Sequence, residues 1–433
     1  MEIQLYTIIP FILMLLSIAV CPILFNNFWE ENKNKLIVAL ILGIPTSIYL
    51  IYMGFGESLK EEMIFDYIPF IVLLGALFVI TGGIFLSGDI QAKPSINTLF
   101  LGIGAVLASL MGTTGAAMLL IRPVIQTNKE RKFKIHTILF FIAIVANCGG
   151  LLTPLGDPPL FMLYLRGAPF AWFFKLLPEW VFMNGILLLI YFLFDSYYYK
   201  KESIEDLKKD KMNISPIKLK GNLNFVWLAG VVLSVAFLNE QYLPFVKQNH
   251  YFGFIREAVI VLMTVLSIFF TSKSTRKSNN FTWEPIKEVA YLFLGIFITM
   301  TPCLIYLKTN ASNLGIETPT QFYFSTGLLS AFLDNTPTAV TFHSLALGLF
   351  QQSADLFNGI PIIAKIPETL LRAISISAVF FGSMTYIGNG PNFMVKSVAE
   401  ENNIKMPDFF SYMIKFSLII LLPLFILVSY LFI

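Results

Sequence analysis

The sequence predicts an all-α polytopic membrane protein. We expect two inverted repeats of five transmembrane helices, each with a re-entrant hairpin and a broken helix. Composition is the first reason, because 56% of the 433 residues are hydrophobic, 13% are charged and the mean hydropathy is +0.73. A soluble domain is about one quarter charged, so lipid must solvate much of this chain. The other two reasons are a series of membrane-length apolar segments and a duplicated pair of polar interruptions.

A helix that crosses a bilayer needs about 20 predominantly apolar residues. Ten segments meet or nearly meet that length: roughly 4–26, 36–54, 67–87, 135–166, 179–195, 223–239, 255–272, 286–307, 363–399 and 408–432. The first has no charge from Ile3 to Trp29 and no basic leader, so we expect a retained helix and not a cleaved signal. We therefore expect a multi-pass protein of the cytoplasmic (inner) membrane. Its partner would be the lipid bilayer, and no nucleic acid is expected.

The loop charges predict the topology, because Lys and Arg in short loops stay on the cytoplasmic side. Basic residues gather at 33–35, 129–134, 200–220 and 273–277, whereas the loop at 57–66 is acidic. Two further apolar stretches, about 95–125 and 319–349, are broken near the middle. The charges predict that both are re-entrant hairpins entering from opposite sides, with both chain ends outside.

These assignments divide the chain into three parts. The first inverted repeat covers 1–196, with its hairpin at about 95–125 and its broken helix at about 135–166. Residues 197–220 form a charged cytoplasmic linker, which we interpret as a solvated connection without an activity. The second inverted repeat covers 221–433, with its hairpin at about 319–349 and its broken helix at about 363–399.

The polar interruptions occur in two imperfect copies. The first copy comprises LASLMGTTGAAMLLI (107–121) and LTPLGDPPLFM (152–162), and the second comprises LSAFLDNTPTAVTFH (329–343) and MTYIGNGPNFM (384–394). Thr153 and Thr385 are identical at one offset, as are Gly156 and Gly388. Such duplicated Gly/Pro-interrupted segments are typical of the substrate site of a secondary transporter.

The copies contain four breaks: GTTG (112–115), LTPLGDPP (152–159), DNTP (334–337) and TYIGNGP (385–391). Irregular backbone at membrane depth must be buried in protein or line a watery cavity, because lipid satisfies no N–H or C=O group. Freed carbonyls and the oxygens of Thr and Asn can coordinate a small hard cation such as Na⁺. Helix N-termini in the same places favour an anion.

Two breaks carry a carboxylate, Asp157 and Asp334. A charged side chain at mid-membrane is costly and usually marks an ion pathway or a proton relay. The alternative is that each Asp caps the helix that follows it, since Asp before Pro is a good N-cap sequence. The two interpretations are compatible, because a capping residue can also bind an ion.

Other polar residues give weaker signals. Arg122 more readily reaches the cytoplasmic surface than forms an anion site, and His343 is expected to be a satisfied buried histidine. The three cysteines have no disulfide or metal spacing. We expect no zinc site and no enzyme, because no metal-ligand cluster or nucleophile–base pair stands out.

The segments ANCGGLLTPLGDPP (146–159) and SAFLDNTPTAVTF (330–342) resemble signature segments of the ion transporter superfamily. Within it, the chain is most similar to NhaD-type sodium/proton antiporters and citrate transporters. The resemblance implies a homodimer and one sodium site per repeat, between a hairpin tip and a broken-helix loop. The first set would be Gly112, Thr113, Thr114, Thr153, Gly156 and Asp157. The second set would be Asp334, Asn335, Thr336, Thr385, Gly388 and Asn389. Of these residues, we expect Asp157, Asp334, Asn335 and Thr336 to ligate sodium.

One departure from the superfamily guides the functional prediction. Its dicarboxylate symporters carry Ser-Asn-Thr at both tips, whereas this chain has Gly-Thr-Thr and Asp-Asn-Thr. Asp334 would repel an anionic substrate unless a metal or a proton neutralised it. We therefore predict sodium (or lithium)/proton antiport, with Na⁺ and H⁺ as the ions and no further cofactor. The alternatives are a cation-coupled carrier of citrate or another organic anion, and an arsenite permease.

Overall fold

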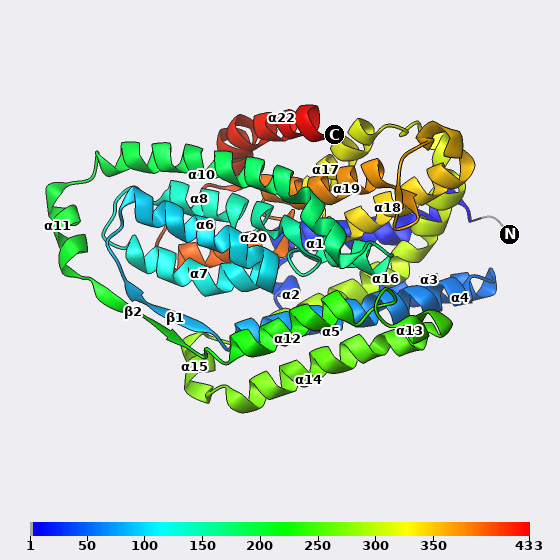
Figure 1. The fold of residues 1–433 in the computed structure, drawn as a ribbon, viewed down its shortest axis with the longest axis horizontal. Coiled ribbons are helices and arrows are strands. Elements are labelled where there is room, and N and C mark those ends of the chain that lie inside the picture. The colour runs from blue at the N-terminus through cyan, green and yellow to red at the C-terminus, as the bar shows by residue number, and fades with distance from the viewer. Residues whose placement is uncertain (1–2) are drawn as a thin grey trace.

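The computed structural model describes residues 3–433 and consists mainly of helices that run side by side (Figure 1). The helices of the first half are α1 (Ile9–Leu24), α2 (Asn26–Trp29), α3 (Asn32–Tyr52), α4 (Gly56–Glu61), α5 (Ile68–Thr81), α6 (Pro94–Met111), α7 (Thr113–Thr127), α8 (Ile135–Ile144), α9 (Pro158–Leu165), α10 (Leu177–Tyr199) and α11 (Ile204–Met212). Those of the second half are α12 (Asn224–Phe237), α13 (Pro244–Gln248), α14 (Phe254–Phe270), α15 (Lys273–Ser278), α16 (Glu284–Thr309), α17 (Pro319–Phe332), α18 (Asn335–Gln352), α19 (Glu368–Phe381), α20 (Gly390–Glu401), α21 (Phe409–Tyr412) and α22 (Leu422–Phe432). Four short strands are β1 (Phe85–Asp89), β2 (Ser215–Lys220), β3 (Ile362–Ile363) and β4 (Ile366–Pro367).

The predicted fold class, an all-α polytopic membrane protein, is confirmed. Within residues 3–433, nine helices are long and apolar enough to cross a membrane. The predicted span at 223–239 is shorter than expected, because α12 has 14 residues and is only about 21 Å long at 1.5 Å per residue. Little of the chain is sheet: β1 pairs antiparallel with β2, and β3 with β4.

The acidic segment 57–66 is not a loop, contrary to the sequence prediction. Residues Gly56–Thr81 form one continuous helix, in which a π-helical turn at Glu62–Tyr67 joins α4 to α5. Two of its acidic side chains, Glu62 and Asp66, form ion pairs with Arg166, whereas Glu57 and Glu61 are exposed. A charged run was mistaken for a loop because its counter-ion lies about 100 residues away in the sequence.

Two helix pairs meet end to end at the predicted hairpins. α6 and α7 pack against each other and join at Gly112, while α17 and α18 pack against each other and join at Leu333–Asp334. The two broken segments also correspond. α8 and α9 are separated by a stretch with a short 3₁₀ turn at Cys148–Leu152, and α19 and α20 by one with a 3₁₀ turn at Gly382–Met384. The opposite membrane orientation of the two halves remains a prediction.

The helices pack in two groups. In the first, α3 packs on α16, and α5, α12 and α14 pack on one another, which places these three side by side in the lower part of Figure 1. In the second, α6 packs on α7 and α10, α9 on α18, and α17 on α19. The two groups meet chiefly where α16 contacts α18 and α5 contacts α7. The hairpins and broken helices therefore all lie in the second group.

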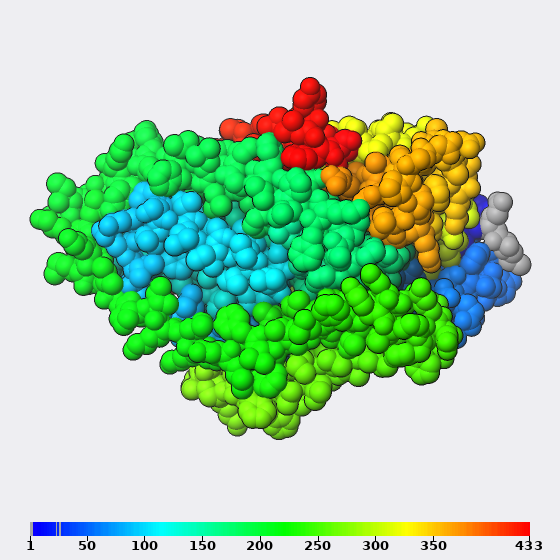
Figure 2. All heavy atoms as spheres, in the orientation of Figure 1, coloured from blue at the N-terminus to red at the C-terminus, as the bar shows by residue number. Residues whose placement is uncertain are grey.

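Large apolar side chains cover the outer surface of both groups. On α10 they include Val181, Leu189 and Leu193, and on α14 they include Leu262 and Phe269. These helices form much of the face seen in Figure 2. Contiguous apolar surface of this extent is what lipid-facing helices require.

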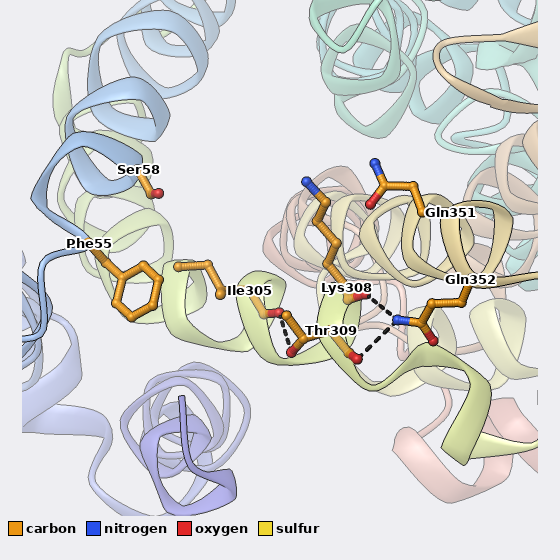
Figure 3. Close-up of a pocket in the computed structure, with 7 residues that line it drawn as sticks. All are labelled: Phe55, Ser58, Ile305, Lys308, Thr309, Gln351 and Gln352. Carbon is orange, nitrogen blue, oxygen red and sulfur yellow. Dashed lines mark hydrogen bonds between the residues drawn. The ribbon is translucent and has the colours of Figure 1, made fainter. Parts of the chain in front are cut away.

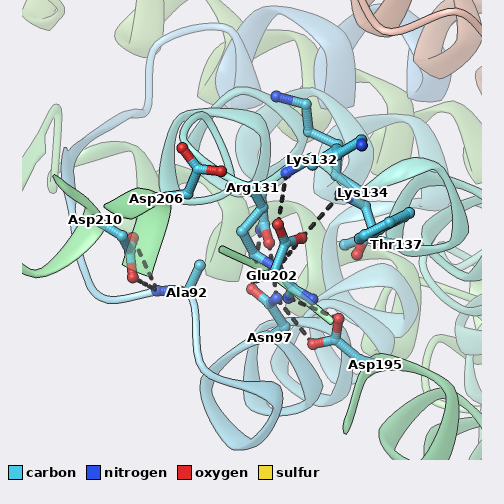
Figure 4. A network of polar contacts seen from close by, with 12 residues as sticks. Ala92, Asn97, Arg131, Lys132, Lys134, Thr137, Asp195, Glu202, Asp206 and Asp210 are labelled. Atoms are coloured by element: carbon cyan, nitrogen blue, oxygen red, sulfur yellow. Dashed lines mark hydrogen bonds and ion pairs between the residues drawn. The ribbon is translucent and has the colours of Figure 1, made fainter. Parts of the chain in front are cut away.

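The linker 197–220 is exposed along most of its length, but one part of it is attached to the first half of the chain. α10 continues to Tyr199, and α11 and β2 follow, with β2 pairing with β1. The linker's Glu202 is buried and accepts hydrogen bonds from the backbone N–H groups of Lys132 (3.0 Å) and Phe133 (2.9 Å) (Figure 4). Asp195 at the end of α10 is also buried and pairs with Arg131 at 2.6 Å. The linker is therefore fastened to the base of the first hairpin.

Candidate ion-binding site

Asp157 lies at the N-cap position of α9, where the sequence Asp-Pro-Pro starts a helix. Proline suits the first turn because its missing N–H would be unsatisfied there anyway. The Asp157 carboxylate, however, accepts no hydrogen bond from the α9 backbone. Asp157 is fully buried, and its side chain points toward the other three breaks. The cap interpretation therefore describes the backbone of Asp157 but not its carboxylate.

Three neutral side chains donate to this carboxylate, one from each of the other breaks. The Thr113 hydroxyl (2.8 Å) and the Asn389 amide (3.1 Å) donate to Oδ1, and the Asn335 amide (2.6 Å) donates to Oδ2. Thr113, Asn335 and Asn389 are themselves buried. We call these four residues the Asp157 cluster. It joins both hairpin tips and both broken-helix loops at one point.

The cluster is made of two pairs of equivalent positions. Asn389 occupies in the second copy the place that Asp157 has in the first, and Asn335 occupies the place of Thr113. Asn389, like Asp157, is the N-cap residue of the helix after the break and makes no side-chain cap bond. Asn335 and Asn389 belong to the second set carried over from the family resemblance, yet both bond to Asp157 of the first.

Asp334 behaves differently from Asp157. Its carboxylate accepts a hydrogen bond from the Thr336 N–H at 2.9 Å and so caps α18. The side chain is half-buried, and it directly precedes Asn335, whose amide donates to Asp157. The tips also differ in backbone. Gly112 has φ +83°, which only glycine adopts without strain, whereas Asp334 has φ −55°.

Thr153 and Thr385 make equivalent hydrogen bonds in the two copies. The Thr153 hydroxyl donates to the Ser109 carbonyl in α6, and the Thr385 hydroxyl donates to the Ala331 carbonyl in α17 at 2.5 Å. Each hydroxyl also accepts a backbone N–H of its own loop, from Leu155 and Gly388 respectively. Both hydroxyls therefore fasten a broken-helix loop to its hairpin.

The remaining predicted residues surround the cluster. The Gly156 carbonyl accepts the Thr113 N–H at 2.8 Å, and a side chain at Gly388 would collide with the Gly382 carbonyl. The Thr336 hydroxyl donates to Asn335 Oδ1 at 3.5 Å. Thr114 is half-buried, and within residues 3–433 no hydrogen bond joins its side chain to the cluster.

Two asparagines support the cluster from behind, and the sequence prediction included neither of them. Asn147 Oδ1 accepts from Asn389 (3.2 Å), and Asn147 Nδ2 donates to Asn392 Oδ1 (2.7 Å). Asn392 in turn donates to the carbonyls of Gly382 and Thr385. A comparison of the copies contains the signal for Asn392, because the equivalent residue of the first copy is the apolar Leu160.

The carbonyls of the two 3₁₀ turns at Cys148–Leu152 and Gly382–Met384 accept hydrogen bonds from a neighbouring long helix. From α10, Trp180 donates to the Gly149 carbonyl and Asn184 to the Cys148 carbonyl. From the last helix, Tyr412 donates to the Ser383 carbonyl and Ser417 to the Met384 carbonyl. The irregular backbone is thus buried in protein, as membrane depth demands.

Arg122 and His343 do not join the cluster. The Arg122 guanidinium donates to the Asn279 carbonyl at 3.1 Å. Nε2 of the buried His343 contacts the Ala364 carbonyl at 2.9 Å, while Nδ1 has no partner within residues 3–433. His343, expected to be a satisfied buried histidine, therefore has a hydrogen-bond partner at only one of its two ring nitrogens.

A separate pocket of about 440 Å³ opens between α4, α16 and the end of α18 (Figure 3). Its lining residues are Phe55, Ser58, Ile305, Lys308, Thr309, Gln351 and Gln352. None of the predicted site residues lines it.

Comparison with known proteins identifies the family. The family model described as "Putative citrate transport" matches residues 1–433. The chain belongs to this family. A curated relative, Inner membrane protein YbiR of Escherichia coli (strain K12), is 29% identical over 115 residues, which cover 24% of this chain and 31% of the relative. The match thus spans less than a third of that relative. The chain is a multi-pass membrane protein of this family, and its resemblance to NhaD-type antiporters remains a prediction.

Proposed function

We propose that this transporter exchanges Na⁺ or Li⁺ for H⁺ across the cytoplasmic membrane, with Asp157 as the group that binds either ion. The observation that carries the proposal is the environment of the Asp157 carboxylate. Three neutral donors surround it, and within residues 3–433 no Lys, Arg or His forms an ion pair with it.

Other buried carboxylates of the spanning helices have a cationic partner. Arg372 pairs with Glu179 at 2.6 Å, Arg131 pairs with Asp195 at 2.6 Å, and Arg256 pairs with Glu257. A buried charge without such a partner is strongly disfavoured. A proton or a metal cation removes the penalty at Asp157, and the two compete because they bind the same oxygens. Competition for one carboxylate is the simplest way to couple opposite fluxes of two cations.

The neighbours of Asp157 can supply further oxygen ligands. Asn335 and Asn389 now point their NH₂ groups at the carboxylate, and a half-turn of either amide would present its carbonyl oxygen instead. With the Thr113 hydroxyl, this gives a set of oxygen ligands of the kind that hard cations prefer. Asp334 and Thr336, at the tip of the second hairpin, would supply the remaining oxygen ligands. We keep Gly112, Thr114, Thr153, Gly156, Thr385 and Gly388 as proposed lining residues.

A second candidate function is cation-coupled transport of citrate or a related organic anion, which the family description favours. The Asp157 cluster contains no positive group for a carboxylate substrate, so the anion would need a bound metal or a separate contact. The pocket in Figure 3 offers such a contact through the Lys308 ammonium and the neighbouring Gln351 amide. If citrate is the substrate, Lys308→Gln should raise its KM and leave the coupling ion's KM unchanged.

One experiment tests both candidates. Purified protein is reconstituted into proteoliposomes with an imposed pH gradient, and lumenal pH is followed after addition of Na⁺, Li⁺, K⁺, citrate or arsenite, one at a time. We expect Na⁺ or Li⁺ alone to discharge the gradient. Uptake of labelled citrate with no discharge by Na⁺ alone would replace the antiport proposal with the second candidate.

A further inference from the structure

The short helix α9 connects the Asp157 cluster to a second buried polar site. Asp157 is its N-cap and Arg166 its C-cap, and Leu160 to Leu163 between them are almost completely buried. Eight helical residues separate the two ends by about 12 Å. A rigid helix of this length transmits any movement of one end to the other.

Arg166 reaches from α9 to two carboxylates on another helix. Its Nη2 atom lies 2.9 and 3.0 Å from the two carboxylate oxygens of Glu62 and 2.8 Å from Asp66 Oδ2. Only 14% of the Arg166 side chain is exposed, and the two acidic side chains are 17% and 13% exposed. These ion pairs are therefore shielded from water, which strengthens their mutual attraction.

The contact crosses between the two helix groups. α9 packs on α18 and α19, beside the second hairpin. Glu62 and Asp66 lie four residues apart in the π-helical turn of Gly56–Thr81, whose other neighbours include α16, α12 and α14 of the first group and α7 of the second. Short π-helical turns inside helices frequently occur at functional sites.

The Arg166 contact also differs from a fully satisfied structural arginine. All three bonds use Nη2, and Nε is buried with no partner within residues 3–433. An incompletely satisfied buried donor makes a contact easier to open.

We propose that Arg166 is a positioning residue for the Asp157 cluster: with Glu62 and Asp66 it latches the end of α9 to the helix Gly56–Thr81, and this latch opens in every transport cycle. The proposal rests on the proposed transport by alternating access, in which one helix group moves against the other. A latch of this kind fixes the position of Asp157 while the ion binds, and releases α9 when the groups move.

A reversible bridge between the two sides of the latch tests it. Glu62→Cys and Arg166→Cys are combined in a chain whose Cys21, Cys148 and Cys303 are replaced by Ala, and Hg²⁺ is added to link the two thiolates. We expect Hg²⁺ to lower transport at least about tenfold and excess thiol to restore it, because the groups can no longer separate. Loss of maleimide labelling after denaturation verifies the bridge.

The matched control bridges two helices of the same group. Lys35 on α3 pairs with Glu288 on α16 at 2.8 Å, and the double variant Lys35→Cys/Glu288→Cys should transport at the same rate with and without Hg²⁺. Undiminished transport by a verified Glu62–Arg166 bridge would overturn the latch. If the cysteine-free parent transports citrate but not Na⁺, the antiport proposal fails. The bridging test of the latch then uses citrate uptake as its measured transport rate.

A gentler variant keeps the proposal testable if the double variant does not fold. Glu62→Gln preserves shape and leaves Arg166 paired with Asp66. We expect the KM for Na⁺ to rise about fivefold without a fall in the maximal rate, because the loosened α9 presents Asp157 less well. A purely structural ion pair would lower the yield of folded protein and leave KM unchanged, and that result would overturn the positioning role.

Discussion

The Asp157 carboxylate and the Asn335 amide lie 2.6 Å apart, although 178 residues separate them in the sequence. The bond joins the broken helix of one half to the hairpin tip of the other. Because the copies of one duplicated motif meet here, the two halves build one polar centre together. This centre, more than the repeat itself, supports the proposal that the breaks form one ion-binding site.

Asp157→Asn should abolish cation-coupled transport. The substitution removes the charge that attracts a cation and places an NH₂ group against side chains that already donate. A loss of about 2.8 kcal/mol of ion binding corresponds to an affinity about 100-fold lower. The measurement is the rate of Na⁺-driven pH change in proteoliposomes. Wild-type rates in this variant, with normal membrane insertion, would remove Asp157 from the mechanism.

Thr113→Val should weaken ion binding more than the same change at its neighbour Thr114. Valine has nearly the shape of threonine but cannot donate to Asp157, and a hydrogen bond to a charged group contributes about 1.5–3 kcal/mol. We expect the KM for Na⁺ to rise about 10-fold or more. Thr114→Val is the matched comparison and should raise the KM less, because no hydrogen bond within residues 3–433 joins the Thr114 side chain to Asp157. Equal effects of the two substitutions would contradict the role of the Thr113 hydroxyl.

Asp334 should tolerate Asn better than Ala. Asn is as good an N-cap as Asp, so Asp334→Asn keeps α18 capped, whereas Asp334→Ala costs about 1 kcal/mol of stability. We expect Asp334→Asn to transport with a moderately raised KM for Na⁺, because only a nearby charge is lost. Thermal unfolding in detergent and transport rates measure the two effects separately. Complete loss of transport in a stable Asp334→Asn protein would make Asp334 a direct ligand.

Thr385→Val should destabilise the fold by about 1–3 kcal/mol, since the substitution leaves the Ala331 carbonyl and the Gly388 N–H without the shared hydroxyl. Thr264→Val is the control, because the Thr264 hydroxyl only bonds the Ile260 carbonyl of its own helix. Thermal unfolding of the two variants in detergent compares them. If Thr385→Val and Thr264→Val unfold at the same temperature, the Thr385 hydroxyl is not needed to hold the loop.

Glu202→Gln should loosen the linker. One of the backbone donors at Lys132 and Phe133 would face an NH₂ group, at a cost of about 1–3 kcal/mol. Glu205→Gln, on the exposed side of α11, should change stability by less than about 0.5 kcal/mol. Limited proteolysis within 200–220 measures the difference, and equally slow cleavage of both variants would contradict the linker attachment.

The four breaks could be predicted from the sequence because Gly and Pro interrupt a helix wherever it lies. The candidate residues followed from those breaks, and most of them lie at or next to the Asp157 cluster. Their individual roles could not be predicted. Asp157 and Asp334 precede similar Pro-containing segments, but only the fold determines that Asp334 caps its helix while the Asp157 carboxylate points across to the other half.

Long-range neutralisation was the second obstacle. Glu62 and Asp66 can lie in a helix because Arg166 forms ion pairs with them. Glu202 can be buried because the backbone N–H of Lys132 donates a hydrogen bond to its carboxylate. A charged stretch considered alone predicts a solvent-exposed segment, because the local sequence does not show which distant residue neutralises its charges. For this reason the acidic segment 57–66 reads as a loop in the sequence, and the burial of Glu202 within the otherwise exposed linker 197–220 is not predicted.

Proton release on sodium binding tests the central claim most directly. NaCl is added to purified, lightly buffered protein, and the pH change is recorded for the wild type and for Asp157→Asn. If Na⁺ and H⁺ compete for Asp157, the wild type should release up to about one proton per chain and the variant none. Sodium binding without proton release, or the same release from both proteins, would contradict the claim.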